Sequence, residues 1–115
     1  MTPFSALLSD LCHSRRILQK QLAHSLDVDP SYLSALASGR KGTPSDAFLQ
    51  KLSACLELSD TERQALVESV KISKRKYQVP KKVHPDFYAV AWKMFNVAEH
   101  LPEAKLKVIN QILEL

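Results

Sequence analysis

Glycine and cysteine are both scarce in this sequence. The 115 residues include two glycines and two cysteines, and they contain no glycine-rich segment that could cradle a phosphate group. Cys12 and Cys55 lie far apart, each among apolar residues, so we expect small buried thiols in a reducing compartment. The sequence therefore offers neither a phosphate-binding loop nor a reason to expect a disulfide.

Long apolar runs and motifs for chemistry are missing as well. No run approaches the roughly 18 apolar residues that a membrane span needs, and the N-terminal residues lack the pattern of an export signal. The histidines and cysteines do not have the spacing of metal ligands, and no nucleophile stands in a recognisable catalytic motif. We therefore expect a soluble, cytoplasmic protein that is not an enzyme and that uses no metal, cofactor or membrane.

The charge is distributed unevenly. The net charge is +4, but residues 1–70 carry seven Lys and Arg against eight Asp and Glu, whereas residues 71–115 carry nine against four. Six of those nine basic residues lie in the segment 71–82, KISKRKYQVPKK. This segment is either a solvated linker or an arm that adds phosphate contacts independent of base sequence.

The whole chain is predicted to be helical, because apolar residues recur at intervals of three and four and no segment alternates like a strand. Three helix starts are marked by a capping residue directly before a proline: Thr2-Pro3, Asp29-Pro30 and Thr43-Pro44. Ser59 and Glu62 form a capping box for another start. Five short helices are thus expected within residues 3–73, the second to fifth at about 19–25, 30–38, 44–56 and 60–73.

Two further helices are expected after the basic segment. Pro85 begins one whose apolar residues share a face: Phe87, Val90, Ala91, Met94, Phe95 and Ala98. Leu101-Pro102 ends it, and the last helix presents Leu106, Ile109, Ile112 and Leu113. These two stripes need a partner, either the five-helix core or a second copy of the chain. We divide the chain into a domain at 1–73, a basic linker at 74–84 and a helical extension at 85–115, a candidate dimerisation element.

The segment 17–42, ILQKQLAHSLDVDPSYLSALASGRKG, holds two short amphipathic helices. Their apolar faces consist of Leu22, Ala23 and Leu26 in the first helix and of Leu33 and Leu36 in the second. The turn between them has the length found in a helix-turn-helix. Ala23 is small enough to let a neighbouring helix cross close to it.

This pattern resembles the phage lambda repressor/Cro-like helix-turn-helix, also called the XRE family. The residues that carry the resemblance are Gln19, Leu22-Ala23, Leu26, Val28, Tyr32-Leu33-Ser34, Leu36 and Gly39-Arg40-Lys41. It covers about residues 4–73 and implies an all-α fold, a five-helix lambda-repressor-like domain here followed by a two-helix extension. The family docks the second helix of the motif in the major groove of DNA.

Three residues depart from the family pattern. Asp27 stands where the family usually has a glycine in left-handed conformation, which aspartate adopts at some cost. Leu18 stands where a Ser or Thr often caps the helix, and Ala37 where a Glu commonly forms a structural ion pair. We expect weaker capping at Leu18 and no ion pair at Ala37.

The outward face of the second motif helix follows from its buried one. With Leu33, Leu36 and Ala37 inward, the outward residues are Ser31, Ser34, Ala35 and Ser38, and Tyr32 lies on the flank. Small side chains permit close approach to a groove, serine can donate to or accept from base edges, and alanine can touch a thymine methyl group. The family resemblance adds Gln19 as a DNA contact, which either braces the phosphate-side end of the recognition unit or reaches a base. Tyr32 either packs on the following helix or gives its hydroxyl to a phosphate.

The loop after this helix contains both glycines. Gly39 is expected to end the helix in left-handed conformation, and Arg40 and Lys41 then point toward phosphates. Gly42 is expected to turn the chain into the start at Thr43-Pro44, where exposed amides favour an anion.

The sequence predicts a sequence-specific double-stranded DNA-binding transcriptional regulator. We expect a repressor that acts as a homodimer on an inverted repeat, with Ser31, Ser34, Ala35 and Gln19 reading bases and Tyr32, Ser38, Arg40 and Lys41 holding phosphates. The alternative is an antitoxin or anti-repressor type of module that binds a protein partner through its C-terminal helices.

Overall fold

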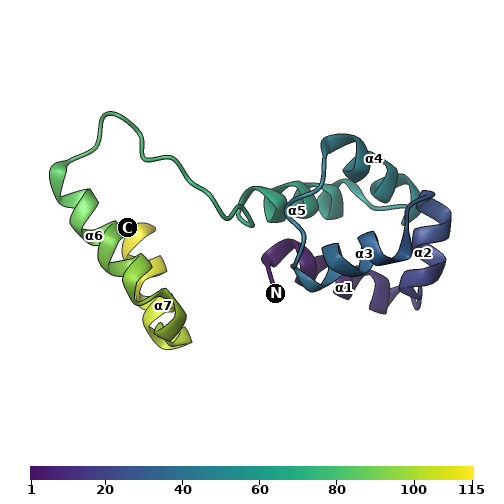
Figure 1. The fold of residues 1–115 in the computed structure, drawn as a ribbon, viewed down its shortest axis with the longest axis horizontal. Helices are drawn as coiled ribbons and strands as arrows, with labels where there is room; N and C mark the ends of the chain where they lie inside the picture. Colours follow the sequence, from purple (N-terminus) through teal and green to yellow (C-terminus); the bar gives the residue numbers. More distant parts are fainter. The chain divides into compact units, whose positions relative to one another are not determined.

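The computed structural model describes residues 1–115, and all of its regular elements are helices. The chain divides into two compact units, Met1–Tyr77 and Gln78–Leu115. The first contains α1 (Pro3–Ser14), α2 (Gln19–Leu26), α3 (Pro30–Ser38), α4 (Asp46–Cys55) and α5 (Asp60–Lys71) (Figure 1). The second contains α6 (Pro85–Asn96), the 3₁₀-helix η1 (Ala98–His100) and α7 (Glu103–Leu113). The predicted all-α fold, five helices followed by two, is confirmed. No helix combines the length and apolar character that crossing a membrane requires.

Local capping explains most of the helix starts. Thr2 caps α1, since its hydroxyl accepts a hydrogen bond from the Ser5 amide at 3.1 Å while the Ser5 hydroxyl accepts from the Thr2 amide at 2.8 Å. Asp29 caps α3, and Ser59 with Glu62 forms the expected capping box of α5. These predicted starts are confirmed.

The predicted start of α4 at Thr43-Pro44 is wrong. The helix begins at Asp46, and Ser45 caps it by accepting a hydrogen bond from the Phe48 amide at 3.2 Å. Ser45 followed by Asp46 gives the helix both a capping hydroxyl and a carboxylate in its first turn, so it outcompetes the start two residues earlier. Pro44 is buried in the preceding loop. The helix N-terminus, whose amides were expected to favour an anion at Thr43-Pro44, therefore lies at Ser45-Asp46.

Two helix ends also differ from prediction. The sixth helix was expected to reach Leu101, but α6 ends at Asn96 and η1 follows it, so Ala98 lies outside the α-helix. The fifth helix ends at Lys71, with Ile72 as its C-terminal cap, two residues before the predicted end.

The core of the first unit draws side chains from all five helices. Helix α3 contacts α1 and α2, α1 also contacts α5, and α2 also contacts α4. The most deeply buried side chains include Leu8, Leu22, Leu33, Leu36, Leu52 and Leu66. Ala23 is completely buried, which fits the predicted close crossing of α2. The predicted inward face of α4 is confirmed as well, because Phe48, Leu49, Leu52 and Leu56 are all buried.

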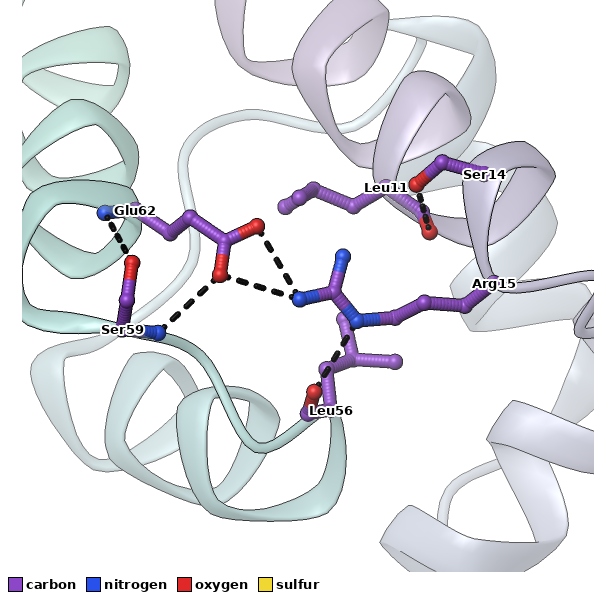
Figure 2. Close-up of polar contacts among 6 residues, drawn as sticks. All are labelled: Leu11, Ser14, Arg15, Leu56, Ser59 and Glu62. Atoms are coloured by element: carbon purple, nitrogen blue, oxygen red, sulfur yellow. Dashed lines mark hydrogen bonds and ion pairs between the residues drawn. The ribbon is translucent and has the colours of Figure 1, made fainter.

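An ion pair joins the first helix to the fifth (Figure 2). The Nη2 atom of Arg15 lies 3.0 Å from each carboxylate oxygen of Glu62, and its Nε donates to the Leu56 carbonyl at 3.0 Å. Glu62 also accepts from the Ser59 amide at 3.0 Å. The Ser59 amide and the Arg15 guanidinium together hold the pKa of the Glu62 carboxyl below its usual value. Arg15 thus fastens the end of α4 and the start of α5 to α1, although Ala37 offers no ion-pair partner.

Two departures from the family pattern are accommodated locally. Asp27 takes the left-handed conformation expected of it, with φ 55° and ψ 46°. Leu18 gives α2 no side-chain cap, but the Gln21 side-chain oxygen accepts from the Leu18 amide at 3.0 Å. This hydrogen bond supplies half of a capping box and offsets part of the missing cap.

The two cysteines are both free, but they differ in exposure. Cys12 is buried, and this burial raises the pKa of its thiol. Cys55 is only half-buried, so the expectation of two buried thiols holds for Cys12 alone.

In the second unit no residue is buried, and only Val83, Ala91, Leu101 and Ile109 are half-buried. The apolar side chains predicted to share one face of α6 are therefore largely in solvent. Trp92 and Phe95 are 66% and 74% exposed. Neither side chain therefore belongs to a core of the second unit.

Gly39 and Gly42 have different roles. Gly39 ends α3 in the left-handed conformation with φ 80°, as predicted. A Cβ atom there would lie 3.2 Å from both the Met1 Cα and the Thr2 nitrogen. Gly42 has no positive φ, and a Cβ atom at Gly42 would meet nothing within 4 Å. The turn expected of Gly42 thus does not require glycine.

Gly39→Ala should lower the free energy of unfolding by about 1 to 3 kcal/mol, because alanine would strain the left-handed backbone and crowd Met1 and Thr2. Gly42→Ala is the matched control and should change it by less than about 0.5 kcal/mol. Urea unfolding followed by circular dichroism measures both. Equal losses in the two variants would contradict this assignment.

Candidate nucleic-acid interface

Helix α3 has a buried face and an accessible one. Leu33, Leu36 and Ala37 are buried, as predicted from their spacing. On the other side, Ser31 and Ser38 are exposed, whereas Tyr32, Ser34 and Ala35 are half-buried. All of the predicted site residues on α3 are thus accessible from outside the fold.

At the start of α3, the Ser31 hydroxyl is already engaged. The Asp29 carboxylate accepts from the Ser31 amide at 2.8 Å and from the Ser31 hydroxyl at 2.6 Å. Both hydrogen bonds lower the pKa of the Asp29 carboxyl. Ser31 therefore retains only the acceptor capacity of its oxygen, and its amide in the first turn of α3 is capped by the Asp29 carboxylate.

In the middle of the accessible face of α3, the side chains of Ser34 and Ala35 make no hydrogen bond within the chain. The Ser34 hydroxyl has no hydrogen-bond partner within the chain, so it is free both to donate and to accept. The Ala35 methyl group is half-buried and presents a small apolar spot beside it. This pair combines one adaptable polar group with one that can contact a methyl group.

The end of α3 holds the basic loop in place. The amides of Arg40 and Lys41 both donate to the Ala35 carbonyl, at 3.0 and 3.2 Å. The Ser38 hydroxyl donates to the same carbonyl at 3.2 Å and accepts from the Arg40 Nε atom at 2.9 Å. Ser38 is thus committed to positioning Arg40, whose terminal guanidinium nitrogens have no partner in the chain.

Tyr32 packs on α4, which was one of the two roles expected of it. Its ring meets the Phe48 ring edge-to-face, with centroids 5.9 Å apart and planes at 74°. The Lys41 ammonium lies 5.2 Å from the centroid of the Tyr32 ring, a favourable cation–π arrangement. The Tyr32 hydroxyl makes no hydrogen bond within the chain, so packing leaves it available to a ligand.

Gln19 is the first residue of α2 and is exposed. Its side-chain amide makes no hydrogen bond within the chain. The structure therefore leaves both its donor and its acceptor atoms free at the N-terminal end of α2.

Sequence reasoning missed a contact at the end of α3. The Nη2 atom of Arg75 donates to the Gly39 carbonyl at 2.8 Å. The basic composition of the segment 71–82 was the only signal in the sequence, and it did not identify this acceptor. Elsewhere in the chain, no three His, Cys, Asp or Glu side chains are grouped so that they could hold a metal ion.

Comparison with known proteins agrees with this geometry. Residues 14–62 match a family model described as helix-turn-helix. The chain is also similar to the uncharacterized HTH-type transcriptional regulator RghRB of Bacillus subtilis (strain 168), with 33% identity over 58 residues, 50% of this chain and 42% of that protein. The match therefore spans less than half of the relative's length. No solved structure matches the chain.

The family match covers both helices of the predicted motif, α2 and α3. Both helices lie entirely within the matched residues 14–62. The predicted XRE-type helix-turn-helix is therefore confirmed for this part of the chain. Its second helix is α3, the helix that carries the accessible serines.

Asp29→Ala should lower the thermal midpoint at neutral pH by several degrees, because it removes the acceptor that caps α3, whereas Asp29→Asn should keep that cap. The ordinary pKa of the Asp29 carboxyl is 3.8, and the Ser31 hydrogen bonds lower it in the folded state. The stabilisation is therefore complete above that ordinary value and is lost as the pH falls through the lower, folded-state pKa.

Thermal unfolding followed by circular dichroism, between about pH 2 and pH 7, tests this dependence. The difference in thermal midpoint between wild type and Asp29→Ala should stay constant near neutral pH and become smaller in acid. A difference that does not change with pH would contradict the capping role, and so would an Asp29→Asn variant as unstable as Asp29→Ala.

Proposed function

We propose that this helix-turn-helix protein is a sequence-specific double-stranded DNA-binding transcriptional regulator, a repressor that acts as a homodimer on an inverted repeat. The observation that carries the proposal is the combination on α3 of a small accessible face with a fixed basic loop at one end. The helix-turn-helix match at residues 14–62 and the similarity to an uncharacterized HTH-type transcriptional regulator support it.

In this proposal α3 enters the major groove and Ser34 and Ala35 face the base edges. The free Ser34 hydroxyl can donate to or accept from a base, and the Ala35 methyl group can contact thymine. Ser31 contributes only as an acceptor, which suits an amino group of adenine or cytosine. Gln19 adds an amide from the exposed start of α2.

The basic loop would bind the phosphates beside that groove. Arg40 and Lys41 supply the positive charge, and the Tyr32 hydroxyl supplies a neutral donor. Ser38 acts through Arg40, which it holds by the 2.9 Å hydrogen bond. Phosphate contacts of this kind fix the register of α3 without choosing the base sequence.

The exposed apolar side chains of the second unit support a homodimer. Isolated helices of about 12 residues are marginal in water, and α6 and α7 have 12 and 11 residues with none of them buried. A second copy would cover the same apolar faces by two-fold symmetry and build a small helical bundle. Two recognition helices about 34 Å apart would then read an inverted repeat. Repression would follow from occupancy, because the bound dimer excludes other proteins from the same DNA.

Selection from a random duplex library should enrich a two-fold symmetric site, and anisotropy titrations on that site then separate the two kinds of contact. Arg40→Ala should weaken binding to every duplex by at least about tenfold near 0.1 M salt and flatten the salt slope by about 1 for each protomer of the bound dimer. Ser34→Ala should instead relax the preference at one base pair per half-site.

Gln64→Ala, at an exposed position of α5, is the control and should bind like wild type. Binding that ignores salt, or Arg40→Ala equal to this control, would contradict the proposed contacts.

Phe95→Asp should convert the dimer to a monomer, because it places a charge in the exposed apolar surface of α6. Asn96→Asp adds the same charge at the neighbouring exposed residue and should remain dimeric. Sedimentation velocity measures both, and only Phe95→Asp should lose its preference for the full inverted repeat over a half-site. A monomeric wild type would contradict the homodimer and favour the antitoxin or anti-repressor type of protein interaction for these helices.

A further inference from the structure

The basic segment 71–82 leaves the first unit from a fixed point. Two residues after α5 ends, the Ser73 hydroxyl accepts from the buried Phe4 amide at 2.9 Å and donates to the Ser69 carbonyl. Ser73 itself is buried although its neighbours are exposed. The chain is thus pinned to the N-terminal end of α1 at the place where its basic residues begin.

Arg75 then ties the segment to the end of α3. Its Nη2 atom donates to the Gly39 carbonyl at 2.8 Å, across 36 positions of sequence. Gly39 directly precedes Arg40 and Lys41, so this hydrogen bond brings the Lys74-Arg75-Lys76 triplet to the same end of α3 as the basic loop. The close packing of Gly39 on Met1 and Thr2 fixes the carbonyl that Arg75 reaches.

The hydrogen bond to Gly39 leaves other N–H donors of the Arg75 side chain free. A guanidinium carries five N–H donors, and the other donors of Arg75 have no partner in the chain. Arg75, Lys74 and Lys76 are all exposed. Residues 1–70 have a net charge of −1. The three cations at 74–76 therefore form a positively charged cluster beside a domain that has no net positive charge of its own.

We infer that the triplet Lys74-Arg75-Lys76 is a second phosphate-binding element of the DNA interface. Arg75 bridges the Gly39 carbonyl and a backbone phosphate, and the flanking lysines contact the phosphates on either side. This inference rests on the proposed function, and it extends the interface from the helix-turn-helix into the connector. The contacts add affinity at every sequence and leave base preference unchanged.

A purely structural role for Arg75 would explain its hydrogen bond to Gly39, but it would not explain the two lysines on either side of Arg75. A cation at a helix C-terminus interacts favourably with the helix dipole, and one arginine suffices for that. Lys74 and Lys76 make no hydrogen bond or ion pair within the chain. The structural role and the phosphate-binding role predict different results when the lysines are removed. The Arg75–Gly39 hydrogen bond does not need the lysines, whereas phosphate binding would lose two of its three cations.

Lys74→Gln with Lys76→Gln removes two charges and leaves Arg75 in place. Binding to the selected duplex should weaken by at least about tenfold near 0.1 M salt, and the slope of log K against log salt should flatten by about 1 to 2 for each protomer of the bound dimer. Arg75→Gln should flatten the slope by about 1 for each protomer and also lower the thermal midpoint. Base preference in the selection should stay as in wild type.

Lys105→Gln with Lys107→Gln is the matched control, since it removes the same charge at the same spacing from exposed positions of α7. It should keep affinity within about twofold of wild type and the same salt slope. Sedimentation checks that both double variants have the oligomeric state of wild type.

The outcomes separate this inference from the proposed function. A wild-type protein that binds no duplex overturns the proposed function and the inference with it. If wild type binds its selected site but Lys74→Gln with Lys76→Gln binds equally well, or no worse than the α7 control, the inference alone is overturned. The same holds if Arg75→Gln lowers only the thermal midpoint and leaves the salt slope unchanged.

Discussion

The left-handed backbone of Gly39 is the constraint on which the candidate interface depends. It ends α3 at φ 80° and turns the amides of Arg40 and Lys41 back to the Ala35 carbonyl. The same residue packs on the backbone of Met1 and Thr2, so the first turn of α1 and the last turn of α3 are placed together. The Gly39 carbonyl then accepts a hydrogen bond from the Arg75 side chain. One glycine therefore sets where the helix stops and which cations gather beyond it.

The accessible face of α3 is chemically polarised. A carboxylate caps its start, where Asp29 takes up the Ser31 amide and hydroxyl, and cations follow its end. The serine hydroxyls at both ends of the face are hydrogen-bonded within the chain, Ser31 to Asp29 and Ser38 to the Ala35 carbonyl and Arg40. Among the serines of the helix, Ser34 alone has a free hydroxyl. In the proposed complex this arrangement keeps phosphates at the Gly39 end and leaves base recognition to the middle of the helix.

Local signals in the sequence were enough for most of the helices but not for all of the site. Caps at Thr2, Asp29 and Ser59 were predictable because each acts within one turn, and burial of Leu33 and Leu36 followed from their spacing. The start at Thr43-Pro44 failed because two capping sequences compete within three residues, and pattern alone does not rank them. The Arg75 hydrogen bond joins residues 36 positions apart, and no periodicity encodes which carbonyl a long side chain reaches. The apolar faces of α6 and α7 were predicted, but the sequence pattern of these helices does not say what covers them.

In the proposed complex, the accessible face of α3 and the loop after it contact the DNA duplex. Amide chemical-shift mapping, with the selected duplex titrated into labelled full-length protein, tests it most directly. We expect the largest shifts at residues 31–41, with Gln19 and the amides of residues 74–76 also affected, and little change at the exposed α5 residues Thr61, Gln64 and Glu68. Shifts centred on α5, with the amides of Ser34 and Arg40 unmoved, would contradict the account.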